Sequence, residues 1–98
     1  MPDITVIDAE KRRAEDQLLD VREDFEVAAG MIPGAIHIPM GELNSRLAEI
    51  DQFRPVIVVC RSGNRSSRVA AALTAAGFAA DNMAGGMSAW QRAGLPVG

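Results

Sequence analysis

The chain has 98 residues, a formal net charge of -3, 48% hydrophobic residues and 23% charged residues. These values fit one soluble domain, residues 1–98, and exclude a disordered chain, because the apolar content is high and the net charge is low. One cysteine and one histidine exclude a disulfide framework and a zinc site built from such residues. We therefore predict no metal and no cofactor.

The overall charge and the lone thiol restrict the partners and the compartment. No apolar run approaches the length of a transmembrane helix, and a lone thiol favours a reducing compartment, so we expect a cytoplasmic protein with no membrane contact. The mild acidity argues against a nucleic-acid partner. Between Cys60 and Arg68, however, the chain carries three arginines (Arg61, Arg65 and Arg68) and no acidic residue. That local reversal of sign is a first indication of an anion site.

In the first half of the chain, short apolar runs alternate with helical patterns. Strands are expected at residues 4–7, 18–21 and 35–38. Helices are expected at residues 8–15, 23–29 and 41–50. Asp8 is the expected N-cap of the first helix, and Gly30 is expected to end the second.

The second half contains the clearest strand, at residues 56–59. This run of Val and Ile is apolar throughout, which predicts a central parallel strand that is buried on both faces. A helix is expected at residues 65–76 with Val69, Leu73 and Ala76 inward, then a strand at 79–83 and a helix at 87–93. Strands and helices alternate throughout, which predicts an α/β fold, a three-layer α/β/α sandwich around a mostly parallel sheet.

Cys60 stands at the C-terminal end of the predicted central strand, where ligands bind in sheets of this kind. The segment that follows, Arg61-Ser62-Gly63-Asn64, is a loop that leads into a helix. Backbone N–H groups in such a loop form an anion cradle, and the start of the helix adds its positive dipole end. Arg61 and Arg65 add positive charge. We therefore predict that the pKa of the Cys60 thiol lies well below its ordinary value.

A structural alternative exists for Cys60, because a single cysteine at the end of a buried strand is usually an inert apolar residue. The nucleophile, the cradle and the counter-charge occur together in one short segment, however, and a structural cysteine needs none of them. This combination favours a reactive thiol.

The sequence resembles a single-domain rhodanese, a thiosulfate sulfurtransferase-type domain, over nearly its whole length. The matching segments are Leu19-Asp20-Val21-Arg22, Glu23 with Phe25 and Glu26, Gly30-Met31-Ile32-Pro33-Gly34-Ala35, Ile38-Pro39, Cys60-Arg61-Ser62-Gly63-Asn64-Arg65-Ser66, Gly85-Gly86-Met87 with Trp90, and Gly94-Leu95-Pro96-Val97. The chain departs from the family at Met31, where the family often has His. That turn lies away from the cysteine chemistry, so the departure concerns local packing.

The resemblance implies a five-stranded parallel sheet in the order 3-2-4-5-1 with helices on both faces. It also implies a sulfurtransferase that carries a persulfide on Cys60 and passes sulfur from thiosulfate or another donor to cyanide or a thiol. The substrate-binding residues are then Arg61, Ser62, Gly63, Asn64, Arg65 and Ser66. Arg61 would orient the donor, and Arg65 would brace the loop.

Several residues have structural alternatives beside these roles. Ser62, Asn64 and Ser66 are expected to act through backbone N–H groups, and Ser66 could instead cap the helix. The supporting residues Asp20 and Arg22, at the end of a neighbouring strand, are expected to form an ion-pair or hydrogen-bond hub, for instance between Arg22 and Glu26. His37 is expected to be a partly exposed strand residue, and Trp90 to dock the last helix on the core.

Two other functions fit the same fold. Cysteine phosphatases and arsenate reductases resemble this loop but carry one more residue between the cysteine and the arginine. A non-catalytic interaction module is the third possibility, although such modules normally lose the cysteine. The partners expected of a sulfurtransferase are a small-molecule donor and a thiophilic acceptor, with a protein acceptor as the alternative, and the chain is expected to be a monomer or a weak homodimer.

Overall fold

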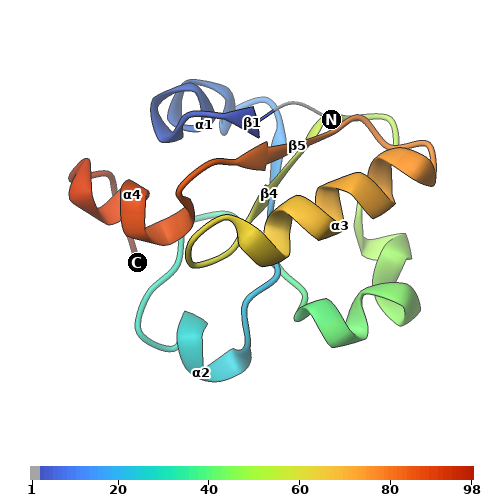
Figure 1. Cartoon of the computed structure of the whole chain (residues 1–98), viewed down its shortest axis with the longest axis horizontal. Helices are drawn as coiled ribbons and strands as arrows, with labels where there is room; N and C mark the ends of the chain where they lie inside the picture. Colours follow the sequence, from blue (N-terminus) through green and yellow to red (C-terminus); the bar gives the residue numbers. More distant parts are fainter. Residues whose placement is uncertain (1–2) are drawn as a thin grey trace.

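The computed structural model describes residues 3–98 and contains one parallel sheet of five strands in the order β1-β5-β4-β2-β3 (Figure 1). The strands are β1 (Asp3–Ile4), β2 (Gln17–Asp20), β3 (Ile36–His37), β4 (Val56–Val59) and β5 (Ala80–Met83). Each pair of neighbours is parallel. The order is the predicted 3-2-4-5-1 read from the other edge, so the predicted fold class is confirmed.

Helices cover both faces of the sheet and complete the three layers (Figure 1). On one face lie α1 (Val6–Arg12) and α4 (Gly86–Arg92), and on the other lie α3 (Asn64–Ala75) and the 3-10 helix η1 (Met40–Glu49). The short helix α2 (Asp24–Val27) follows the C-terminal end of β2. Within residues 3–98, no helix has the length and apolar character needed to cross a membrane.

The central strand β4 separates two apolar cores. Successive side chains of a strand point to opposite faces, so Val58 packs in the core that contains Leu73 of α3. Val59 packs in the core that contains Trp90 of α4. All four residues of β4 are buried, as the apolar run predicted, and Trp90 docks the last helix on the core as expected.

The predicted strand at residues 4–7 is wrong beyond Ile4. The Thr5 hydroxyl accepts a hydrogen bond from the backbone N–H of Asp8 at 3.1 Å, so Thr5 rather than Asp8 is the N-cap. The helix therefore begins at Val6. A β-branched run of four residues favoured a strand, and the local cap overrides that preference.

The other helices also differ from their predicted bounds: α1 ends at Arg12 rather than at residue 15, α2 covers only Asp24–Val27 and ends before Gly30, and α4 begins at Gly86. The segment predicted as a helix at 41–50 is a 3-10 helix that is interrupted at Arg46, whose φ is -124°. Helix α3 begins at Asn64, one residue before its predicted start. It buries Ala70 together with Val69 and Leu73, whereas Ala76 is exposed because the helix has already ended there.

Gly86 allows α4 to start directly against the end of β4. Its φ is +56°, and a Cβ there would lie 2.6 Å from the carbonyl oxygen of Arg61 and closer still to that of Cys60. Two backbone N–H groups of α4 use this approach, because Met87 donates to the Cys60 carbonyl at 2.8 Å and Ser88 donates to that of Arg61 at 3.0 Å. Only glycine fits this position, so α4 fixes the start of the loop after β4 from behind.

Candidate active site

The Cys60 sulfur is the centre of a small hydrogen-bonded cluster at the C-terminal end of β4. Its Sγ accepts a hydrogen bond from the backbone N–H of Gly63 at 3.1 Å and another from the hydroxyl of Ser66 at 3.2 Å. Both groups donate hydrogen bonds to the sulfur, and such donors stabilise the charged thiolate over the neutral thiol. Cys60 exposes none of its surface, so the sulfur lies beneath the loop rather than on it.

These contacts lower the pKa of Cys60. Burial acts first and raises the pKa, because it disfavours the charged thiolate. The Ser66 hydroxyl and the backbone amides of Ser66, Gly63 and Ser62 act in the opposite direction and together outweigh it. The predicted direction is therefore confirmed, and its main causes are hydrogen bonds rather than the arginines.

The loop takes this shape because Gly63 adopts a left-handed conformation, with φ at +102°, immediately before α3. A Cβ at this position would also lie 3.2 Å from the backbone nitrogen of Gly85. Gly63 is the N-cap of the helix, so the alternative role of Ser66 as a cap is wrong. Ser66 lies inside the helix and is fully buried, and its hydroxyl points to the sulfur. Ser62 and Asn64 are exposed at the outer side of the loop.

Arg65 braces the loop, as predicted, through Glu26 of α2. Two nitrogens of its guanidinium contact the two carboxylate oxygens at 2.7 and 2.8 Å, which is a bidentate pair. The hydrogen bond from Arg65 is the main cause that lowers the pKa of Glu26 to about 2. The Cys60 charge is a smaller cause, after Glu26 itself, that raises the pKa of Arg65.

The suggested hub between Arg22 and Glu26 is wrong in its pairing. Arg22 instead forms a buried ion pair with Asp20, with Nη2 at 2.8 Å from Oδ2, and donates to the Gly30 carbonyl at 2.9 Å. Arg22 and Asp20 are two residues apart at the end of β2, so their side chains lie on the same side of the strand and make contact. The hub therefore ties the strand beside Cys60 to the turn at residues 30–34.

Two further contacts lie beside this ion pair, one at Arg22 and one at Met31. His37 is partly buried, as expected, and its Nε2 lies 2.8 Å from the Arg22 carbonyl oxygen. Met31, the position of the departure from the family pattern, exchanges two backbone hydrogen bonds with Gly98. Met31 thus contributes its backbone to the packing of the turn, and its side chain is outside the cysteine cluster.

A cavity of about 350 Å³ opens beside the loop, next to Arg61. It is lined by Arg22, Phe25, Glu26, Ala29, Arg61, Met87, Ser88 and Gln91. Arg61 is exposed on this side, whereas Arg65 is engaged with Glu26. Of these two loop arginines, Arg61 is therefore the one whose side chain lines the cavity and is not paired with Glu26.

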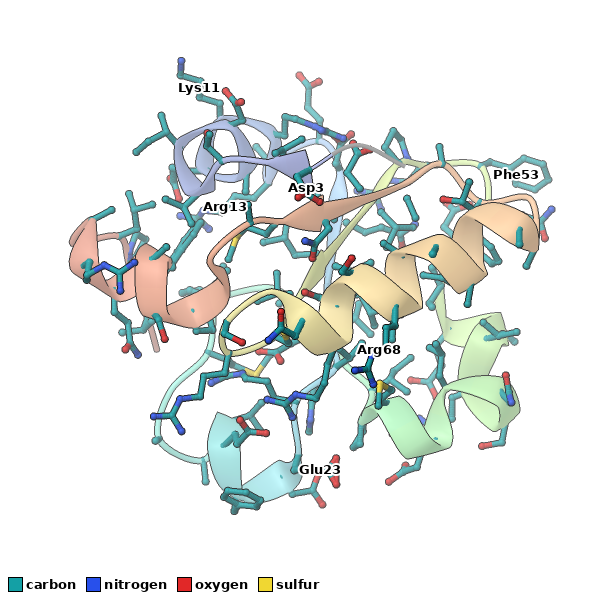
Figure 2. All side chains as sticks on the ribbon, viewed as in Figure 1. Asp3, Lys11, Arg13, Glu23, Phe53 and Arg68 are labelled. Carbon is teal, nitrogen blue, oxygen red and sulfur yellow. The ribbon has the colours of Figure 1, made fainter. Side chains whose placement is uncertain are left out.

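A larger hollow of about 530 Å³ lies at the opposite end of β4, around residues 47–53 with Ala76 and Phe78. Phe53 marks it in Figure 2, far from the loop that precedes α3. Its lining contains neither a cysteine nor a basic residue. The smaller cavity therefore lies at the end of the sheet that carries Cys60 and Arg61.

Asn82 belongs to the cysteine cluster and was missed from the sequence. It lies in β5 beside Val58 of β4, and its Oδ1 accepts a hydrogen bond from the Ser66 hydroxyl at 2.5 Å. A polar residue inside a predicted buried strand was the signal that could have found it. The Arg65 pairing with Glu26 left no such signal, because the two residues are far apart in sequence.

The fold and the site define an α/β protein whose one cysteine in the sequence lies at the end of the central strand, with its sulfur hydrogen-bonded by the following loop and its pKa lowered. Comparison with known proteins agrees. The chain belongs to the rhodanese-like domain family, whose family model matches residues 5–93.

Similar proteins are found among both sequences and structures. YtwF of Bacillus subtilis is 45% identical over 84 residues, which are 84% of this chain and 82% of that protein. A protein of Allochromatium vinosum named "Sulfurtransferase" is 45% identical over 85 residues, 85% of this chain and 79% of that protein. The crystal structure of a rhodanese-related protein from Thermoplasma volcanium has a TM-score of 0.95 and 31% identity, and the match covers 100% of this chain and 98% of that one.

The pair between Arg65 and Glu26 predicts a pH-dependent stability. The pKa of Glu26 falls from its ordinary value of 4.5 to about 2 on folding, so the pair stabilises the protein fully above about pH 4.5 and loses this effect as the pH falls through about 2. Glu26→Gln, which keeps an oxygen for the Glu23 N–H, should lower the free energy of unfolding by about 1 kcal/mol near neutral pH.

Urea unfolding near neutral pH and again at about pH 2 measures this difference. The deficit of Glu26→Gln should shrink at the lower pH. Glu15→Gln, which neutralises an exposed carboxylate, is the matched control and should show little deficit at either pH. A deficit of equal size at both pH values would contradict the ion-pair account.

Proposed function

We propose that this protein is a sulfurtransferase that moves a sulfane sulfur from thiosulfate or another donor to cyanide or a thiol acceptor. The observation that carries the proposal is the Cys60 sulfur, held by the N–H of Gly63 and the hydroxyl of Ser66 in surroundings that lower its pKa. A thiolate formed in this way is a nucleophile that needs no separate general base. The name of the Allochromatium vinosum relative supports the same class of reaction.

The proposed reaction has two balanced steps. The Cys60 thiolate attacks the outer sulfur of thiosulfate, a new S–S bond forms, and sulfite leaves with the electron pair of the bond that breaks. The enzyme then carries a persulfide. Cyanide or a thiolate attacks the terminal sulfur, the S–S bond breaks, and its electron pair returns to Cys60. No oxidant or reductant other than the two substrates is consumed.

The short loop favours sulfur over phosphate. Four residues separate Cys60 from Arg65, and the side chain of Arg65 turns away to Glu26 rather than closing over the sulfur. A tetrahedral oxyanion would need a wider ring of donors and a free bidentate arginine. The segment between Cys60 and Arg68 also lacks a carboxylate that could protonate a leaving oxygen.

The partners that we propose follow from the cavity beside the loop. A volume of about 350 Å³ exceeds what one thiosulfate ion fills, and its lining combines Arg61 with the apolar side chains of Phe25 and Met87. A thiol acceptor larger than cyanide, carried on a small molecule or on a protein, fits this lining.

Intact mass spectrometry after incubation with thiosulfate tests the proposed function directly. The chain should become heavier by one sulfur atom, and cyanide should return it to its original mass. Cys60 is the only cysteine, so Cys60→Ala should keep its mass throughout. A folded parent protein that never gains sulfur, or a gain that persists in Cys60→Ala, would contradict the proposed persulfide.

Arg61→Ala should weaken the use of anionic donors more than the release of sulfur to cyanide. The exposed guanidinium attracts the donor dianion, whereas the persulfide is stabilised by the loop amides. The loss should be on the order of 1–3 kcal/mol in kcat/KM for thiosulfate.

The two half-reactions are measured separately by single-turnover kinetics. Arg68→Ala removes an exposed positive charge from α3 outside the loop and serves as the matched control for net charge (Figure 2). Equal losses in both half-reactions of Arg61→Ala, or an equal loss in Arg68→Ala, would rule out a specific role in donor binding.

A further inference from the structure

Asn82 is a buried polar residue whose two amide atoms both have partners. Only 3% of its surface is exposed. Its Nδ2 donates to Oδ1 of Asp3 at 3.2 Å, and its Oδ1 accepts from the Ser66 hydroxyl at 2.5 Å. Figure 2 shows Asp3 on β1, alongside β5, which is where this contact is made. The contact with Asp3 orients the amide so that its oxygen, not its nitrogen, faces Ser66.

The Ser66 hydroxyl has two acceptors and one proton. Its Oγ lies 3.2 Å from the Cys60 Sγ and 2.5 Å from the Asn82 Oδ1. A hydroxyl donates one strong hydrogen bond at a time, and neither the thiolate nor the amide oxygen can donate one in return. The two acceptors therefore compete. The Ser66 hydroxyl lies closer to the Asn82 oxygen than to the Cys60 sulfur, so Asn82 competes effectively for this hydrogen bond.

We propose that Asn82 is a positioning residue of the sulfur site, which withdraws the Ser66 hydroxyl from the Cys60 sulfur whenever that sulfur carries no charge. The proposal rests on the proposed function for its place in a reaction cycle. Its chemistry is a property of the resting protein and can be measured without any sulfur donor.

The competition follows the charge on the sulfur through the two steps. When Sγ is a thiolate, the Ser66 hydroxyl turns to it and the Asn82 oxygen loses its donor. When Sγ becomes the inner, uncharged sulfur of a persulfide, it is a weak acceptor and the hydroxyl returns to Asn82. Asn82 thus favours the sulfur-loaded form and moderates the stability of the free thiolate.

Other charges around the cluster have to be separated from this effect. The charged side chains on the surrounding elements are Asp3 on β1, Asp20 and Arg22 at the end of β2, Glu26 on α2, Arg61 in the loop, Arg65 and Arg68 on α3 and Asp81 on β5. A substitution of Asn82 by an uncharged residue changes the charge of none of them. Asp81 already pairs with Arg12, on the other side of β5.

The test is the pH dependence of Cys60 alkylation by iodoacetamide in four proteins: the parent, Asn82→Leu, Ser66→Ala and the double variant. Leucine is close to asparagine in size and removes the competing acceptor. Asn82→Leu should lower the midpoint by about half a unit to one unit, since one hydrogen bond is freed for the thiolate. Ser66→Ala should raise it. The double variant should match Ser66→Ala, because Asn82 acts only through the Ser66 hydroxyl.

Controls exclude a structural or a charge explanation. Asp3→Asn keeps an oxygen for the Asn82 amide while it removes the carboxylate charge, and its midpoint should stay near that of the parent. If Asn82→Leu does not fold, as judged by circular dichroism, Asn82→Ala replaces it with the same expected direction.

Three results would overturn the proposal: an unchanged or raised midpoint in the Asn82 variant, an equal shift on the Ser66→Ala background, or the same shift in Asp3→Asn. Failure of the proposed function is a separate observation, because it would appear as a missing sulfur gain in a protein whose alkylation still responds to Asn82.

Discussion

Two hydrogen bonds to the Cys60 sulfur, from the Gly63 amide and the Ser66 hydroxyl, determine the chemistry of this protein. Burial alone would hold the cysteine as a neutral thiol, as it does for most cysteines at the ends of buried strands. Together with the backbone amides of Ser62 and Ser66, these donors outweigh burial and lower the pKa of Cys60. They exist only because β4 ends at Val59, the chain turns through a left-handed glycine, and α3 starts at once.

The rest of the fold holds that turn in place from two sides. Behind it, α4 starts against the carbonyls of Cys60 and Arg61, an approach that Gly86 alone permits. In front, the pair between Arg65 and Glu26 ties α3 to α2. Each support uses a residue that is distant in sequence from the cysteine. The loop therefore depends on contacts from both layers of helices, and the Cys60 sulfur lies fully buried while the cavity opens on the Arg61 side.

The alternating strands and helices and the cysteine loop could be predicted from local signals in the sequence, whereas the order of the strands was implied by the family resemblance. The apolar run at β4 and the loop residues up to Ser66 each fall within a few positions. What could not be predicted depends on tertiary contacts. The cap at Thr5 starts a helix in a run that resembles a strand. Arg65 pairs with Glu26 instead of remaining in solvent. Asn82 contacts Ser66 only because β5 lies beside β4. Contacts between distant segments of this kind leave no periodic pattern in the sequence, so they could not be predicted from it.

The central claim is that hydrogen bonds lower the pKa of the only cysteine in the sequence, Cys60, below its ordinary value. The most direct measurement is the ultraviolet absorbance of the thiolate, followed against pH in the unmodified protein with Cys60→Ala as the blank. The account predicts a midpoint below that of free cysteine, about 8.5, since the pKa of Cys60 is lowered by its hydrogen bonds. A midpoint at or above that of free cysteine would show that burial dominates and would contradict the account.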